Sequence, residues 1–582
     1  MQKASKNASI LWFLLFIIVS AAGYGLIGYH WKRTQAGELI LTFGALFLMY
    51  GLVISQKWDE RQTQRWIWTA IGFRFLLLFS VPALSDDYFR FIWDGRLLSA
   101  GYNPYLYLPS EIITTSIAAD AHLSEALFQG LNSPNYFTVY PPLNQWMFDL
   151  AAWISGVLAS ASVFASGTSA KRKVAMVGTG HRGTSMWGVA VVKEFSDVIE
   201  FVGLCDINPG RAETARKMLN VNCPLFTDFE KMMRETKPDI LIVTTVDATH
   251  DQFIIKGMEM GADIVTEKPM TTDEGKCQAI LDAEKRTGKK VTVTFNYRYS
   301  PHRQKLYELL REGAIGKVTS VDFHWYLDTS HGADYFRRWH RLEEKSGSLW
   351  VHKASHHFDL LNWWLESEPE SVYAQGALEH YGKNGTIRGT NCRSCAHKAE
   401  CKFYFDVTKD KRLTALYVDN EKYDGYHRDG CVFKEDINIY DKMAATIHYA
   451  NGVNVSYSLT TYSPYEGYRI AFNGTKGRLE AWVKESGKMT REPYDELMLS
   501  KNFGEVEYIK IPQAEGHGGG DARLRDKIFR NPNAADTFRQ SAGSRDGAMA
   551  ILVGIGARKS MKTGQPVKIA DLTDLKPVAV KA

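Results

Sequence analysis

The charge density of the chain changes sharply near Ala170, and this change constrains the fold more than any other feature. Residues 1–170 carry only 10 of the 70 basic and 10 of the 65 acidic side chains. A long segment with so few charges and several apolar runs is typical of a membrane-embedded protein, whereas the rest has the charge content of a soluble one. We therefore predict two physically different parts, residues 1–170 and 171–582.

Apolar stretches in the first part are candidate membrane spans, because crossing a bilayer takes about 20 residues. The first is longer than the core of a signal peptide, which favours a retained span over a cleaved leader. The second is short, and the fourth contains Asp149. The four expected transmembrane helices are Ser9–Tyr29, Leu39–Ile54, Trp66–Leu84 and Trp146–Ala165.

The distribution of basic residues predicts the orientation of these spans. Lys and Arg residues flank the first span on its N-terminal side and follow the second and fourth spans. By the positive-inside rule, the N-terminus and everything after Ala170 are cytoplasmic, and residues 85–142 face outward. We therefore expect a multi-pass protein of the cell membrane, with the lipid bilayer as a partner and the second part in the cytoplasm.

The expected outer loop contains SDDYFRFIWDGRLLSAGYNPY, Ser85–Tyr105. Its acidic residues Asp86, Asp87 and Asp94 could bind a divalent cation or act as a general base, or could simply be solvated. The string resembles the first outer loop of multi-spanning, lipid-phosphosugar-dependent glycosyltransferases of the mannosyltransferase type, over about residues 10–165. Those enzymes have many more spans, so we expect a truncated fragment without transferase activity.

A dinucleotide-binding pattern begins at Lys173. An apolar strand, Val174–Val177, is followed by Gly178, Gly180 and Gly183, then by a helix-like segment and a second strand that ends at Asp206. Such glycines allow a tight turn and close approach of a pyrophosphate, which the following helix N-terminus favours. A carboxylate at Asp206 would bind the ribose hydroxyls and repel a 2′-phosphate, so NAD is favoured over NADP, although Arg211 could offset this.

Apolar strands continue to alternate with helices, as a parallel sheet requires. The next strands are expected at Pro238–Thr245, Ala262–Met270 and Val291–Tyr299. The triplet Glu267-Lys268-Pro269 follows a strand end, at the edge where doubly wound sheets bind ligands. Residues 171–300 are therefore predicted to form a Rossmann domain.

The glycine turn, Asp206, the EKP triplet, the N-Y-R segment and the later HHFD resemble the glucose–fructose oxidoreductase and inositol dehydrogenase family (Gfo/Idh/MocA). The resemblance covers about residues 171–575. It implies an α/β protein in which residues 301–582 form a second domain with a large, mostly antiparallel sheet. It also implies a bound NAD, a sugar, inositol or related polyol as substrate, and chemistry at the EKP lysine and a histidine. We also consider a homo-oligomer formed through this sheet.

Hydride transfer from a secondary alcohol needs a group that accepts the hydroxyl proton and a cation that polarises the carbon–oxygen bond. Lys268 suits the second role, and His356 suits the first because imidazole titrates near neutrality. His352 lies one turn earlier on the expected helix WVHKASHHFDLLNWW, where inositol-dehydrogenase-like members carry an aspartate. His352 is a third catalytic candidate. Because it replaces that aspartate, neither the path of the proton nor the identity of the substrate follows from the resemblance. The alternative for each histidine is a structural side chain.

The remaining site residues follow from the same pattern. Arg298 and His356 are expected to contact substrate. The segment His324–Arg341 and the glycine-rich loop at His517 could bind a polyhydroxylated ligand or serve as domain interface and turn. Expected cofactor contacts are Gly178, Thr179, Gly180, His181, Arg182, Gly183, Asp206, Thr245, His250, Glu267 and Lys268.

Four cysteines are closely spaced: Cys392, Cys395, Cys401 and Cys431. A cytoplasmic location disfavours stable disulfides, and four thiolates suit a structural zinc ion. His397 or His427 could replace one ligand. An iron–sulfur cluster and free thiols are the alternatives.

The net charge of +5 on 582 residues excludes a dedicated polybasic nucleic-acid binder. The pattern instead favours an NAD-dependent dehydrogenase of sugars or polyols. Three alternatives remain: a glycosidase that uses NAD for transient oxidation, a non-catalytic dinucleotide-binding protein, and a membrane glycosyltransferase fragment. Accumulation of free NADH would favour the dehydrogenase over the glycosidase. A protein that binds NAD but tolerates the loss of Lys268 would be the non-catalytic dinucleotide-binding protein.

Overall fold

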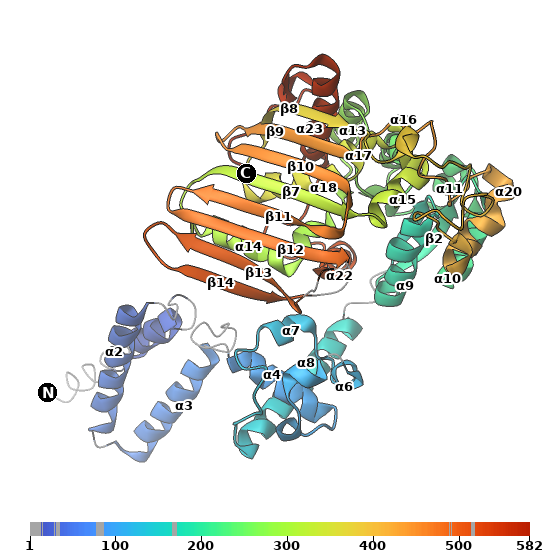
Figure 1. Ribbon diagram of the computed structural model, residues 1–582. Helices are drawn as coiled ribbons and strands as arrows, with labels where there is room; N and C mark the ends of the chain where they lie inside the picture. The colour runs from blue at the N-terminus through green and yellow to red at the C-terminus, as the bar shows by residue number, and fades with distance from the viewer. Residues whose placement is uncertain are drawn as a thin grey trace. The chain divides into compact units, whose positions relative to one another are not determined.

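The computed structural model divides the chain into two compact units, Met1–Ser169 and Ala170–Ala582, which are described separately (Figure 1). Apart from a few single residues, the structure describes residues 16–27, 35–56, 58–76, 87–113, 115–165, 171–487, 492–513 and 518–581.

The first unit is helical where it is described. Its helix α2 is apolar, and Ile40, Leu41 and Phe47 on it are 71%, 75% and 70% exposed. The helices are α2 (Ala36–Ile54), α3 (Glu60–Leu76), α4 (Asp87–Ser99), η1 (Pro104–Leu106), α5 (Pro109–Ile112), α6 (Ser116–Asp120), α7 (Glu125–Gln129) and α8 (Pro142–Ala165).

One helix among the described residues, Gly37–Ile54, is long and apolar enough to cross a membrane, and it contains the expected second span. The part of the first span that is described, Phe16–Ile27, is a shorter apolar helix. The third span extends beyond α3 into residues 77–86, which lie outside the described residues, as do the side chains of residues 154–165 in the fourth. The expectation of four spans therefore stays a prediction.

The acidic residues of the expected outer loop have protein partners. Asp94 is buried and accepts hydrogen bonds from Arg90 Nε (2.9 Å) and Gln145 Nε2 (2.8 Å). Asp87 accepts one from Asn132 Nδ2 at 2.7 Å, and Asp86 lies outside the described residues. Because its partners are an arginine and an amide, we assign Asp94 a structural role, in an ion pair with Arg90 on α4.

The second unit begins with the predicted parallel sheet, whose strand order is β3-β2-β1-β4-β5-β6. Helices on both faces bury β4 completely, which explains its continuous apolar run. Its elements are β1 (Arg172–Val177), η2 (Gly183–Val189), α9 (Ala190–Phe195), β2 (Ile199–Cys205), α10 (Pro209–Leu219), β3 (Leu225–Phe226), α11 (Phe229–Thr236), β4 (Ile240–Val243), η3 (Asp247–Thr249), α12 (His250–Glu259), β5 (Asp263–Thr266), α13 (Glu274–Thr287) and β6 (Val291–Val293).

The predicted second sheet is also present, in the order β14-β13-β12-β11-β7-β10-β9-β8-β15. Only the pair β7 and β10 is parallel, so the sheet is mostly antiparallel. Its strands are β7 (Val318–Asp328), β8 (Pro369–Ala377), β9 (Lys442–Tyr449), β10 (Asn454–Ser463), β11 (Tyr465–Gly474), β12 (Gly477–Gly487), β13 (Tyr494–Lys501), β14 (Val506–Pro512) and β15 (Val567–Lys568).

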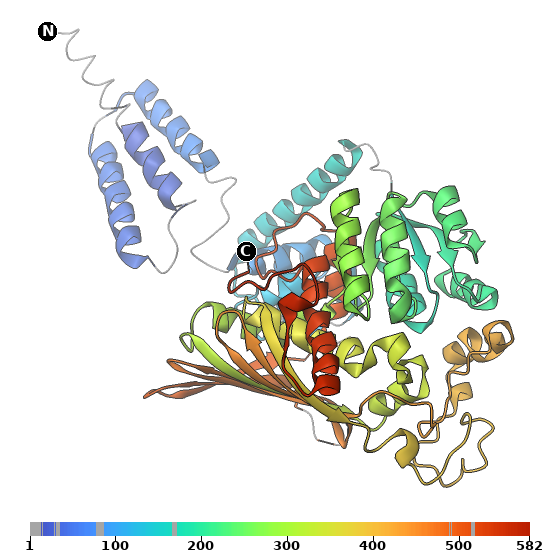
Figure 2. The same cartoon turned by 90° about the horizontal axis from the view of Figure 1, so that it is seen from above.

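Helices pack on one face of this sheet, as Figure 2 shows edge-on. The opposite face carries partly exposed polar side chains such as Asp322 and His324, and a homo-oligomer through it stays a prediction. The helical elements that follow β6 along the chain, some of which pack on this sheet, are η4 (Asn296–Tyr299), α14 (Pro301–Arg311), α15 (His331–Arg337), η5 (Trp339–Arg341), α16 (Glu343–Ser346), α17 (Ser348–His352), α18 (Ala354–Trp364), η6 (Gly382–Asn384), η7 (Val407–Lys409), α19 (Lys411–Leu416), η8 (Val418–Asn420), α20 (Glu421–Asp424), α22 (Gly520–Phe529), α23 (Ser544–Thr563) and η9 (Ile569–Asp571).

The C-terminal helices α22 and α23 pack against the Rossmann domain. Phe529 of α22 packs against Trp187 and Phe195, and Arg525 pairs with Glu194 at 2.7 Å. Helix α23 contacts both β6 and α13. The hydrophobic core of the Rossmann domain therefore includes residues far beyond position 300.

Two local expectations are corrected. The strand expected at Val291–Tyr299 ends at Val293, and Asn296–Tyr299 forms a 3₁₀ turn because Asn296 and Arg298 are buried against acidic partners. The single helix expected around the histidines is divided at Lys353 into α17 and α18. The Lys353 side chain is buried there and donates to the Tyr297 hydroxyl at 3.1 Å.

Candidate active site

The glycine turn after β1 has the geometry of a phosphate-binding loop. Gly178 has φ +89°, and a Cβ on it would lie 2.6 Å from the Thr244 carbonyl oxygen. A Cβ on Gly183 would collide with the Gly178 carbonyl oxygen. Only glycine therefore fits at these two positions, and the backbone N–H groups of the turn lie close to where a pyrophosphate would bind. The residues present fit a dinucleotide.

Asp206 lies at the end of β2, as expected. Its carboxylate accepts hydrogen bonds from Thr179 N (2.7 Å), Thr179 Oγ1 (3.0 Å) and Asn208 N (2.9 Å), and it pairs with Arg211 at 3.2 Å. The carboxylate is thus fixed between the glycine turn and α10, and Arg211 already neutralises part of its charge.

Lys268 follows β5 at the carboxyl edge of the parallel sheet. Its Nζ donates to the His352 carbonyl oxygen at 2.9 Å, so it joins the Rossmann domain to α17. Burial lowers the pKa of Lys268 to about 8, although the Asp247 carboxylate opposes this shift. A partly buried lysine with a lowered pKa at a ligand-binding sheet edge has the properties of a catalytic group.

The His352 ring lies against a carboxylate that the sequence reading missed. Its Nδ1 is 2.5 Å from Asp247 Oδ2, and the two residues are 105 positions apart. Burial raises the pKa of Asp247 and lowers that of His352. A contact this short requires a hydrogen on one of the two atoms, so the Asp247 and His352 side chains share a proton. The signal for Asp247 was its position just after an apolar strand, at the carboxyl edge where ligands bind.

His356 occupies a different place from His352. Its ring stacks on Tyr297, with centroids 4.1 Å apart and 13° between the planes. Tyr297 also receives the hydrogen bond from Lys353 and lies against the Arg303 guanidinium, 4.1 Å from its centroid. Tyr297 and Lys353 were not recognised from the sequence because their partners come from separate elements.

Tyr297 also lines a cleft of about 1340 Å³ in the second unit. The cleft is rich in charged side chains, including Asp328, His331, Glu466 and Glu485. His331 Nδ1 lies 2.8 Å from Glu466 Oε1. Part of the expected ligand segment His324–Arg341 thus lines a cavity, whereas His340 of that segment packs against His352. His517 lies outside the described residues.

Other expected cofactor residues have structural partners. Glu267 accepts hydrogen bonds from Arg182 Nε (2.6 Å) and Trp187 Nε1 (2.8 Å). His250 lies with Nδ1 2.9 Å from the Pro269 carbonyl oxygen and Nε2 3.2 Å from that of Thr245. These residues hold the loops after β1, β4 and β5 together and thereby shape the edge of the cofactor site.

The substrate contact expected for Arg298 is corrected. Its guanidinium bonds to both Asp359 oxygens (2.8 and 2.5 Å), to Asp546 (3.1 Å), and to the carbonyl oxygens of Arg539 and Ser541 (both 3.3 Å). An arginine has five N–H donors, and all are used here. Arg298 is therefore a buried link between η4, α18 and α23.

Replacing Arg298 with Met should reduce the free energy of unfolding by about 3–5 kcal/mol, because it leaves Asp359 buried without its charge partner. Denaturant unfolding of the full chain measures this loss, with Arg286→Met in an exposed pair as the control. An unchanged midpoint for Arg298→Met, together with a raised KM, would restore the substrate role.

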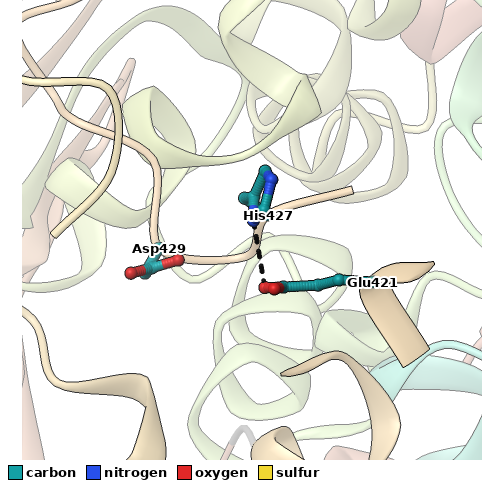
Figure 3. A group of neighbouring side chains, drawn as sticks. All are labelled: Glu421, His427 and Asp429. Atoms are coloured by element: carbon teal, nitrogen blue, oxygen red, sulfur yellow. Dashed lines mark ion pairs between the residues drawn. The ribbon is translucent and has the colours of Figure 1, made fainter. Parts of the chain in front are cut away.

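The four clustered cysteines are not brought together as a metal site among the described residues. The one set of three or more ligand atoms found there within 4.8 Å of one another is Glu421, His427 and Asp429 (Figure 3). Cys392 Sγ instead accepts a hydrogen bond from Arg337 at 3.2 Å. Structural zinc therefore stays a prediction, to be tested by elemental analysis of the purified protein.

Comparison with known proteins decides the family. The model described as "Oxidoreductase family, NAD-binding Rossmann fold" matches residues 172–295. The model described as "Oxidoreductase family, C-terminal alpha/beta domain" matches residues 307–569. The chain belongs to the Gfo/Idh/MocA oxidoreductase family. The resemblance inferred from EKP and HHFD is confirmed, and family membership together with dehydrogenase relatives supports an enzyme that acts on CH–OH groups.

Individual Gfo/Idh/MocA proteins match to different extents. The chain is 37% identical to YteT of Bacillus subtilis (strain 168) over 430 residues, 70% of this chain and all of YteT. It is 23% identical to the inositol 2-dehydrogenase/D-chiro-inositol 3-dehydrogenase of Lactiplantibacillus plantarum over 201 residues, 34% of this chain and 54% of that enzyme. The fold is similar to an oxidoreductase domain protein from Kribbella flavida (TM-score 0.51, 15% identity, 69% of this chain and 99% of that one).

The family match begins at residue 172 and thus leaves the first unit aside. The resemblance of residues 10–165 to membrane glycosyltransferases is not supported by these comparisons. The second unit is therefore the part of the chain that belongs to the NAD-binding Gfo/Idh/MocA oxidoreductases.

Proposed function

We propose that the second unit transfers a hydride between the nicotinamide of NAD and a secondary hydroxyl of a sugar, inositol or related polyol. The observation that carries this proposal is Lys268, partly buried at the carboxyl edge of the parallel sheet and hydrogen-bonded to the backbone of His352. Tyr297 lines the charged cleft and stacks on the His356 ring. The cleft has room for a polyhydroxylated ligand.

When bound, NAD supplies the hydride acceptor. The side chains then have separate tasks. Lys268, as a cation, polarises the carbon–oxygen bond of the substrate and favours loss of the hydroxyl proton. His356 accepts that proton. The His352 carbonyl oxygen holds Lys268 in place, and the Asp247 carboxyl group, bonded to the His352 ring, takes the part of the aspartate that inositol-dehydrogenase-like members carry at position 352.

A panel of sugars, amino sugars and inositols, incubated with the full-length protein and NAD, tests the proposed function. We expect NADH to accumulate with at least one member of the panel. The charge-removing variant Lys285→Met, on the exposed surface of α13, is a matched control that should keep this activity. Cleavage of glycosidic bonds without net NADH would favour the glycosidase alternative.

The role of Lys268 predicts a pH dependence. Its pKa is about 8, and the polarising role needs the protonated form, so kcat should fall as pH rises through about 8. Lys268→Arg retains the cation and should move this decline to higher pH. A wild-type rate that instead increases through pH 8 would mean that the neutral amine is the base.

We further propose that the first unit anchors the enzyme to the cell membrane, with the oxidoreductase domain in the cytoplasm. The exposed apolar surface of α2 supports this proposal. We expect the full chain to sediment with membranes, and residues 171–582 alone to be soluble, folded and able to bind NAD. An insoluble or NAD-silent product from residues 171–582 would argue that the first unit is part of the enzyme.

A further inference from the structure

A long insertion leaves the second sheet after β8 and returns to it at β9, over residues 378–441. Its helical portion, residues 411–424, is here called the strap. The strap consists of α19, Tyr417, η8 and α20, and its α19 and η8 lie against α10 of the Rossmann domain. An element of the second domain therefore reaches the cofactor side of the first.

The strap contacts the glycine turn directly. The backbone N–H of His181 donates to the Tyr417 hydroxyl at 2.8 Å, and a Cβ on Gly180 would lie 3.1 Å from that oxygen. Backbone N–H groups of such turns are the donors that bind a pyrophosphate. The Tyr417 oxygen thus lies at the phosphate-binding side of the loop.

The strap also contacts the end of β2, where the adenosine ribose is expected. Arg211 lies between two carboxylates, 3.2 Å from Asp206 Oδ1 and 2.6 Å from Asp424 Oδ2. Asn208 Nδ2 donates to the Asn420 carbonyl oxygen at 2.9 Å. A side chain at Gly210 would collide with Asn420. The strap is therefore closely fitted to this part of the Rossmann domain.

The C-terminal end of the strap is fixed by ion pairs. In Figure 3, His427 points toward Glu421, at 3.2 Å, with Asp429 beside them. The Arg393 guanidinium pairs with Glu421 and with Asp429, the latter at 3.1 Å. Because this arginine already supplies the positive charge, the cluster anchors the strap to the cysteine-containing loop and needs no metal ion.

We propose that the strap forms the second wall of the adenosine half of the dinucleotide site, and that Asp424 is a second determinant of NAD selectivity. A 2′-phosphate would meet two carboxylates, Asp206 and Asp424, whose shared counter-charge is Arg211. The Tyr417 hydroxyl, in contact with the glycine turn, slows cofactor release. This inference rests on the NAD-dependent function proposed above, and it extends that function to residues of the insertion.

Binding of NAD and NADP to the full-length protein, measured by calorimetry, tests the selectivity. Asp424→Asn should shift the ratio of the two dissociation constants toward NADP on the order of tenfold. Asp419→Asn removes the same charge from an exposed position on the strap and should leave the ratio unchanged. An equal ratio in Asp424→Asn and wild type would overturn the proposal.

Two further measurements keep the test independent of how the variant folds. Wild-type residues 411–424 should gain protection from hydrogen–deuterium exchange when NAD binds, and Tyr417→Phe should release NAD several times faster than wild type. NAD binding without added protection of the strap would overturn this inference alone. A wild-type protein that does not bind NAD would overturn the proposed function as well.

Discussion

Replacing Lys268 with Met should lower kcat by a factor of about 10² or more while NAD binding changes little. The substitution keeps much of the side-chain volume and removes the cation that donates to the His352 carbonyl oxygen. Steady-state kinetics with the substrate identified by the panel measures the loss in kcat, and calorimetry measures NAD affinity.

Lys285→Met removes an exposed lysine from the same domain and should match wild type in both measurements. Near-normal turnover of Lys268→Met would remove the lysine from the mechanism. A large loss of NAD affinity would mean instead that Lys268 mainly binds the cofactor.

Replacing Asp247 with Asn should lower kcat by a factor of about 10 to 10², because the His352 ring loses its carboxyl partner while the shape is retained. KM should change less, since we place Asp247 behind His352 and Lys268. The upper limb of the pH–rate profile should also move, because Asp247 raises the pKa of Lys268.

Asp247→Glu restores the carboxylate and should recover part of kcat, which a purely structural role would not predict. Asp251→Asn, four residues further along the chain, is the control. If Asp247→Asn changes only stability and leaves the pH profile in place, the dyad has no part in the reaction.

The parts of the site that were predictable from the sequence are those written in short, contiguous patterns. Gly178 and Gly183 lie in the expected tight turn, which excludes any side chain at these positions. Lys268 was placed at a sheet edge because strands alternate with helices around it. The parallel sheet and the mostly antiparallel sheet followed from the same patterns and from the family resemblance.

The parts that escaped prediction depend on partners far apart in the chain. Asp247 meets His352 across 105 residues, and Arg211 meets Asp424 across 213. Arg298 had the residue type of a substrate ligand, but its surroundings, Asp359 and Asp546, make it structural. Local patterns carry no information about such pairings, because tertiary packing alone brings them together.

The most direct test of the central claim is to follow the hydride itself. A substrate deuterated at the reacting carbon is incubated with the full-length enzyme and NAD, and the nicotinamide product is examined by mass spectrometry and NMR. We predict deuterium on the reduced nicotinamide ring with wild type and almost none with Lys268→Met. Reduced nicotinamide without deuterium, or equal transfer by the two proteins, would contradict the account.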